Sequence, residues 1–123
     1  MAGIRRFEEI ASWQKARELV RAAYGACSAG PLAKDFGLKD QICRASVSVM
    51  SNIAEGFARK GDKDFAHFLD MARGSAAEVQ SLVYVAKDLG YIDENVFSRL
   101  YGLSDEAQAL IAGLTSYLRN HRK

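Results

Sequence analysis

The chain has 123 residues, of which 49% are hydrophobic and 26% charged, and its formal net charge is +2 at pH 7. This size and apolar content suit one domain with one core, and the modest charge does not by itself demand a nucleic-acid partner. No window approaches the roughly 18 consecutive apolar residues of a membrane span, and the charged N-terminal stretch lacks a signal peptide's apolar core, so we expect a cytoplasmic protein with no membrane partner.

Apolar residues at helical spacing predict a first helix over residues 12–28. Ser12 suits the N-cap position, where a side-chain oxygen accepts a hydrogen bond from a free N–H of the first turn. Gly30 and Pro31 follow the last apolar position and end the helix. The inward face steps by three and four residues and consists of Trp13, Ala16, Val20, Ala23 and Cys27, widened by Leu19 and Tyr24.

The second predicted helix, residues 38–59, carries two apolar stripes where a bundle needs only one. A helix with two apolar faces is buried on more than one side, either in the centre of the domain or against another copy of the chain. The second stripe is therefore our candidate surface for oligomer formation. The first stripe consists of Leu38, Ile42, Ala45, Val49 and Ile53, and the second of Cys43, Val47, Met50, Ala54 and Phe57.

A narrow polar stripe on the same helix has two interpretations. In the structural interpretation, Arg44 and Glu55 pair with neighbouring helices, while Ser48 and Asn52 satisfy backbone groups near a helix crossing. In the functional interpretation, the stripe lines a groove for a ligand or a peptide. The stripe consists of Gln41, Arg44, Ser48, Asn52, Glu55 and Arg59, and the expected partners on the third helix are Asp70, Arg73 and Glu78.

The third and fourth helices are predicted over residues 62–89 and 94–121. Asp62 offers a carboxylate to the start of the third helix, and Gly90 ends it. Gly74 lies in its middle, where glycine costs roughly 1 kcal/mol relative to alanine, so we expect another backbone to approach closely there. The expected inward residues are Phe65, Phe68, Leu69, Ala72, Ala76, Val79, Val83 and Ala86 in the third helix, and Phe97, Leu100, Ser104, Ala107, Leu110 or Ile111, Leu114 and Leu118 in the fourth.

Short connections between long helices make sequence neighbours antiparallel. The sequence therefore predicts an all-α fold, an antiparallel up-down-up-down four-helix bundle that forms a single domain over residues 1–123.

This topology gathers basic residues at one end of the bundle, where the first and third helices start and the second and fourth end. In an oligomer with parallel axes the fields of these ends add and attract the phosphates of RNA or DNA. The alternative is a solvated end, with cations placed where helices terminate. The end collects Arg5, Arg6, Lys15, Arg17, Arg59, Lys60, Lys63, Arg119, Arg122 and Lys123, against Glu8, Glu9, Glu55, Asp62 and Asp64.

No spacing of residues predicts catalysis, a cofactor or a metal site, so we do not expect an enzyme. Neither His67 nor His121 has a nucleophile and an acidic orienter at a recognisable spacing. Asp64 and His67 form one acidic-x-x-His pair, but a ferritin-type metal centre needs two such motifs and two further glutamates. Cys27 and Cys43 lack metal-ligand spacing and are expected to be buried thiols, with a disulfide between them as the alternative.

Several motifs resemble a known family. They are Phe7-x-x-Ile10-x-x-Trp13, Ser51-Asn52-Ile53-Ala54-Glu55-Gly56 and Ala72-x-Gly74-Ser75. These motifs resemble the four-helix-bundle family encoded in intervening sequences of bacterial 23S rRNA genes, the so-called S23 ribosomal protein family, which implies a ring-like homopentamer. The chain is also similar to accessory variability proteins of diversity-generating retroelements, which implies binding to nucleic acid and a reverse transcriptase. Cys43, where arginine is common in the family, weakens a nucleic-acid role for the second helix.

Together these patterns predict a homo-oligomeric scaffold that engages RNA, DNA or a nucleic-acid-handling protein through its basic end. The alternative is an assembly module that binds no nucleic acid. The exposed aromatic residues expected to support that alternative are Tyr84, Tyr91, Tyr101 and Tyr117.

Overall fold

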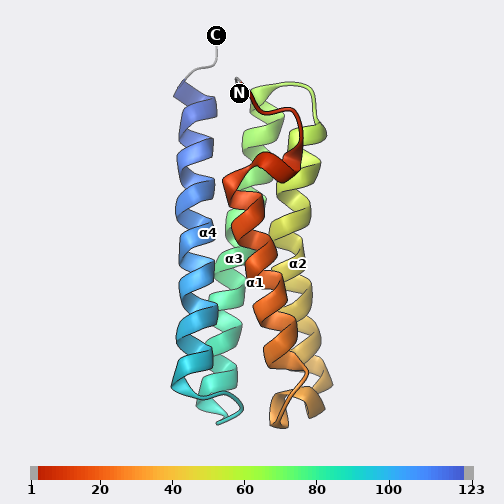
Figure 1. Cartoon of the computed structure of the whole chain (residues 1–123), viewed down its shortest axis with the longest axis vertical. Coiled ribbons are helices and arrows are strands. Elements are labelled where there is room, and N and C mark those ends of the chain that lie inside the picture. Colours follow the sequence, from red (N-terminus) through yellow and green to blue (C-terminus); the bar gives the residue numbers. More distant parts are fainter. Residues whose placement is uncertain (1–2, 121–123) are drawn as a thin grey trace.

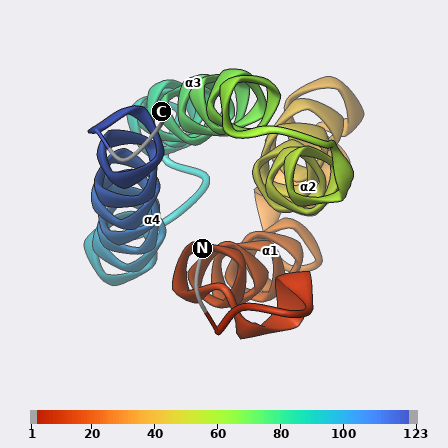
Figure 2. The same cartoon turned by 90° about the horizontal axis from the view of Figure 1, so that it is seen from above.

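The computed structural model describes residues 3–120, which form four long helices and two short 3-10 helices. Successive long helices run in opposite directions (Figure 1), and α4 closes the bundle against α1 (Figure 2). The prediction of an all-α up-down-up-down bundle is confirmed. The elements are η1 (Phe7–Glu9), α1 (Ala11–Cys27), η2 (Pro31–Lys34), α2 (Phe36–Ala58), α3 (Asp62–Asp88) and α4 (Glu94–Asn120).

The start of α1 differs from its prediction. The N-cap residue is Ile10, and Ser12 lies inside the first turn with its side chain buried. The reason is the short helix η1, which leads directly into α1 and places Phe7 against Trp13, with ring centroids 5.2 Å apart. Apolar contacts of the preceding segment, rather than a capping hydroxyl, set where this helix begins.

Side-chain caps set the starts of α2 and α4. The Asp35 carboxylate accepts the Leu38 N–H at 3.1 Å, so α2 begins at Phe36, two residues before its predicted start. The Asp93 carboxylate accepts the Val96 N–H at 2.8 Å at the start of α4. Such caps satisfy N–H groups that have no partner within the helix.

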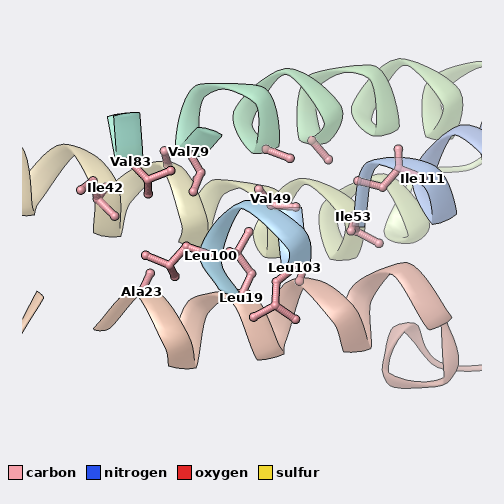
Figure 3. Packing of buried hydrophobic residues seen from close by; sticks show 14 of the residues in the cluster. Leu19, Ala23, Ile42, Val49, Ile53, Val79, Val83, Leu100, Leu103 and Ile111 are labelled. Atoms are coloured by element: carbon pink, nitrogen blue, oxygen red, sulfur yellow. The ribbon is translucent and has the colours of Figure 1, made fainter. Parts of the chain in front are cut away.

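The core follows the long axis of the bundle and is filled with aliphatic side chains from all four helices (Figure 3). Burying one such side chain contributes about 1.5–3 kcal/mol relative to leaving it exposed. The inward face predicted for α3 is confirmed except that Phe68 is half-buried. Its buried members are Phe65, Leu69, Ala72, Ala76, Val79, Val83 and Ala86.

The inward faces of α1 and α4 are rotated slightly from their predictions. In α1, Leu19 is fully buried, Val20 is half-buried and Tyr24 is 52% exposed. In α4, Ile111 is buried, whereas Leu110 is exposed toward the segment that precedes α1. Periodicity gave the correct side of each helix, and the packing partners decided which edge of that side turned inward.

Two helices approach each other closely at Gly56 and not at Gly74. A Cβ atom on Gly56 would lie 2.6 Å from the Phe68 Cβ and 3.0 Å from the Phe65 Cδ1, so α2 and α3 meet here with no room for a side chain. At Gly74 an added Cβ would meet nothing within 4 Å. The prediction for Gly74 is therefore wrong within one copy of the chain.

Candidate functional site

The second apolar stripe of α2 lies on the outside of the bundle and is only partly covered by the chain itself. Val47 is 39% exposed. Cys43, Met50, Ala54 and Phe57 are half-buried at the edge of the core.

Phe36 continues this stripe toward the start of α2, seven residues before Cys43, and is 72% exposed. Sequence reasoning missed Phe36 because the predicted helix began at Leu38, although its heptad spacing to Cys43 was visible. A row of partly exposed apolar side chains is a candidate interaction surface. We name this surface the α2 outer stripe; it consists of Phe36, Cys43, Val47, Met50, Ala54 and Phe57.

The polar stripe of α2 makes different contacts from those predicted. Arg44 Nε donates to the Asp40 carboxylate at 2.7 Å, and Arg59 donates to the Glu55 carboxylate at 3.1 Å. Both pairs lie within α2, one turn apart, so the prediction that Arg44 and Glu55 pair with neighbouring helices is wrong. A partner one turn away on the same helix is always within reach, whereas a partner on α3 requires the right rotation of both helices.

The middle of the polar stripe joins α2 to α3 by hydrogen bonds. The hydroxyls of Ser48 and Ser75 are 2.9 Å apart, and the Asn52 amide donates to the Ser48 carbonyl at 2.9 Å and to its hydroxyl at 3.0 Å. Asn52 therefore reaches a backbone carbonyl as predicted, whereas the Ser48 hydroxyl contacts side chains and no backbone group. Gln41 lies at the other end of the stripe and is exposed.

The end of the bundle that was predicted to be basic contains the start of α1, the end of α4 and the α2–α3 connection (Figure 1). Several of its cations are held by carboxylates. Arg6 pairs with Glu8 at 3.1 Å. Lys15 pairs with Glu18 at 3.1 Å and with Glu106 at 3.7 Å.

These exposed pairs shift the pKa values of their members. The hydrogen bond from Arg6 lowers the pKa of Glu8 and raises the pKa of Arg6. The hydrogen bond to Glu18 raises the pKa of Lys15. The first pair therefore favours the charged forms of Arg6 and Glu8, and the second favours the charged form of Lys15.

Two further cations of this end have partners that sequence reasoning did not assign. Arg119 of α4 donates to Asp70 of α3 at 2.6 Å, so Asp70 is not a partner of the α2 polar stripe. The Arg59 guanidinium lies 4.8 Å from the Phe68 ring centroid, in addition to its pair with Glu55. The end therefore has less uncompensated positive charge than the sequence indicated.

The remaining cations are available for binding. Within residues 3–120, the side chains of Arg5, Lys60 and Lys63 are exposed and form no ion pair. Arg17 lies over the Trp13 ring, 5.7 Å from its centroid. Arg122 and Lys123 lie outside the described residues, as does His121.

The structure also places the cysteine and histidine side chains that the sequence offered as candidates for chemistry. Cys27 is buried, Cys43 is half-buried, and both thiols are free, so the prediction that both are buried is wrong for Cys43. His67 is exposed beside the Phe68 ring, with centroids 6.1 Å apart. Over the described range, no three His, Cys, Asp or Glu side chains are grouped so that they could hold a metal ion. No helix in that range has the length and apolar character needed to cross a membrane.

Comparison with known proteins gives a matching family and a related solved structure. The model of the family described as 23S rRNA-intervening sequence protein matches residues 8–113. The chain is also similar to the crystal structure of a protein of unknown function from the S23 ribosomal protein family of Bacteroides thetaiotaomicron. Identity is 21% over 85% of this chain and 98% of that chain, with a TM-score of 0.78, so the likeness shows a shared fold. A search of curated proteins gave no match.

Proposed function

The chain belongs to the 23S rRNA-intervening sequence protein family, and from this premise we propose that it is a non-enzymatic, self-associating scaffold whose basic end engages nucleic acid. The α2 outer stripe is the observation that carries the first part of this proposal. Val47 and Phe36 expose apolar surface that a second copy would cover, and removing such surface from water is favourable by about 25 cal/mol per Å². The family resemblance implies that the copies form a ring of five.

The self-association is tested by placing a charge inside the stripe. Val47→Glu would bury a carboxylate in the interface, so we expect dissociation of the oligomer in sedimentation velocity while the helical circular dichroism spectrum is retained. Gln41→Glu is the matched control, because it adds the same charge to the same helix on its exposed polar side. Equal sedimentation of the native chain and both variants would contradict this surface.

Nucleic-acid binding is the second part of the proposal, and the unpaired lysines at the α2–α3 connection support it. Lys60 lies in the connection and Lys63 in the first turn of α3, at the end of the bundle that holds the start of α1 and the end of α4 (Figure 1). Ammonium groups without a carboxylate partner are free to replace the counterions of a phosphate backbone. In a ring with parallel axes, these lysines from every copy would face the same side.

Fluorescence polarisation with a labelled RNA, titrated with salt, tests this part. The double variant Lys60→Glu/Lys63→Glu should weaken binding and reduce the slope of log affinity against log salt by about 2, because each phosphate contact contributes about one unit. The matched control is Lys34→Glu/Arg99→Glu, which makes the same charge change near the opposite end. Absence of binding at low salt would refute the nucleic-acid part and leave the self-association intact.

An assembly module without nucleic acid remains the second candidate function, and the ion pairs favour it. Arg6, Lys15, Arg59 and Arg119 each bind a carboxylate of the same chain, which reduces the positive field of the end. An oligomer that ignores RNA and DNA at low salt would establish this candidate. A reverse transcriptase, the partner implied by the resemblance to accessory variability proteins, stays a prediction.

A further inference from the structure

Two cysteine thiols from different helices meet at the surface between α1 and α2. Cys27 is the last residue of α1 and is 3% exposed, whereas Cys43 of α2 is half-buried. Both are free thiols, and both line the same part of the surface.

Backbone geometry supports the same proximity. The Cys27 Sγ donates to the Lys39 carbonyl at 3.9 Å, and Lys39 lies one turn before Cys43 on α2. Side chains on a helix lean toward its N-terminus, so the Cys43 side chain lies over this turn. The sulfur atom of Cys27, on α1, and that of Cys43 therefore both lie beside the same turn of α2.

A surface hollow of about 660 Å³ opens beside the two thiols. Its walls include the aromatic side chains of Tyr24 and Phe36, which are 52% and 72% exposed, and both cysteines line it. The hollow has room for a molecule the size of a short peptide. Its aromatic walls would pack against the apolar parts of such a molecule. Thiols of different accessibility are thus placed inside a cleft that a small reactant can enter.

The hollow also carries one uncompensated positive charge. The Lys39 ammonium lies 4.8 Å from the Phe36 ring centroid. Asp40, the acidic residue of the lining, is held by Arg44 at 2.7 Å, so its charge is balanced by a residue outside the hollow. The lysine therefore favours an anionic reactant.

The two thiols differ in their readiness to react. Burial first, and then the neighbouring Cys43, raise the pKa of the Cys27 thiol to about 12, although Lys39 opposes the shift. Cys27 therefore stays protonated at neutral pH. Cys43 is the more accessible sulfur and is the one that an incoming molecule meets first.

We propose that Cys43 and Cys27 form a thiol–disulfide exchange site for anionic, low-molecular-weight disulfides. In the first step the Cys43 thiolate attacks one sulfur of the disulfide; a mixed disulfide forms on Cys43, and the expelled thiolate takes up the proton that Cys43 released. In the second step Cys27 loses its proton and attacks the Cys43 sulfur, which expels the second small thiol. Two protein thiols are oxidised to one Cys27–Cys43 disulfide, and one small disulfide is reduced to two thiols.

The order of steps follows from the two environments. The negative charge of a Cys43 thiolate opposes ionisation of Cys27, and the mixed disulfide removes that charge. Burial of Cys27 persists, so the second step is the slower one and accelerates as the pH rises. The mixed disulfide should accumulate before the intramolecular disulfide closes.

Oxidised glutathione is the probe, and intact mass spectrometry of the full chain is the measurement. The mass of the native chain should first rise by one glutathionyl group. That group should then leave, and the final product should be lighter than the reduced chain by two hydrogens. Cys27→Ser should stop at the glutathionyl adduct, and Cys43→Ser should not react at neutral pH. Lys39→Gln should slow the first step by a factor of about 3 to 10 at low salt, because the attraction of the anionic probe is lost.

Three results would overturn the proposal. They are no reaction of the native chain, a native reaction that stops at the adduct, and a Cys43→Ser variant that reacts as fast as the native chain. Because Phe36 and Cys43 belong to the α2 outer stripe, the exchange site requires that the hollow stays open when copies associate, and Val47→Glu is treated in parallel. If Val47→Glu reacts and the native chain does not, neighbouring copies cover the site. That result also overturns the exchange proposal, but it supports the proposed self-association.

Discussion

The α2–α3 seam and the α1–α4 seam of this bundle are packed differently. At the first seam the backbones approach so closely that Gly56 has no room for a Cβ, and Ser48, Asn52 and Ser75 satisfy one another. The second seam contains surface hollows of about 170 Å³ and 470 Å³. Within residues 3–120, its Ser12 hydroxyl is buried without a hydrogen-bond partner.

The difference reflects how each pair of helices is joined. A connection of residues 59–61 links α2 to α3, so their relative position is fixed by a short turn and by contacts along their whole length. Helices α1 and α4 are far apart in sequence and meet only when the bundle closes. The α2–α3 seam is therefore the more closely packed, and the α1–α4 seam tolerates imperfect packing.

Gly56→Ala should have the largest effect. The new methyl group would lie 2.6 Å from the Phe68 Cβ, and both atoms belong to helices that cannot separate without opening the seam. We expect the free energy of unfolding to fall by about 2 kcal/mol, since overpacking outweighs the higher helix propensity of alanine. Urea denaturation followed by circular dichroism measures this change. An unchanged midpoint would show that the α2–α3 seam is not closely packed.

Ser12→Ala should raise stability. A buried hydroxyl without a partner costs about 1–3 kcal/mol, so its removal should increase the free energy of unfolding by about 1 kcal/mol. Ser48→Ala is the matched variant in the other seam, and it should lower stability by about 1 kcal/mol because Ser75 and Asn52 lose a partner. Effects of the same sign in both variants would remove the contrast between the seams.

Gly74→Ala should raise the free energy of unfolding by somewhat less than about 1 kcal/mol. The position is helical and exposed, and an added Cβ meets nothing within 4 Å. Alanine is favoured over glycine in a helix interior by up to about 1 kcal/mol. Urea denaturation measures the change against Gly56→Ala, and a loss of stability would show that the space at Gly74 is occupied in the folded protein.

Glu106→Gln should have the smallest effect, although it removes an ion pair between α1 and α4. Lys15 keeps its shorter pair with Glu18, and both carboxylates are exposed. The raised pKa of Lys15 means that its pairs stabilise the fold at neutral pH and lose this effect as the pH rises through that pKa. Thermal melting at low and high salt, at neutral and alkaline pH, measures the difference. A large loss of stability would show that the second seam depends on this contact.

The sequence predicted the features that depend on local periodicity. Ala72, Val79 and Val83 recur at helical spacing, and this alone places them inward in α3. The partner of Asp70 could not be predicted in the same way, because its contact with Arg119 depends on how α3 and α4 are rotated. The pair of Arg44 with Asp40 has a local spacing that the sequence shows, and it was missed. Gly56 and Gly74 look alike in sequence, and only the tertiary packing makes one a contact and leaves the other open.

The candidate surface was predicted in part. The spacing of Cys43, Val47, Met50, Ala54 and Phe57 identified the second stripe of α2, and Phe36 was missed because its cap, Asp35, was not recognised. The basic end was located correctly as the meeting point of the start of α1, the end of α4 and the α2–α3 connection. That its cations pair with carboxylates, as Arg119 does with Asp70, could be seen only in the structure.

Light scattering of the native chain during stepwise dilution tests the central claim most directly. The exposed apolar surface at Val47 and Phe36 predicts a particle whose mass is a multiple of the chain mass and that persists at low concentration. A particle with the mass of a single chain at every concentration would contradict the account.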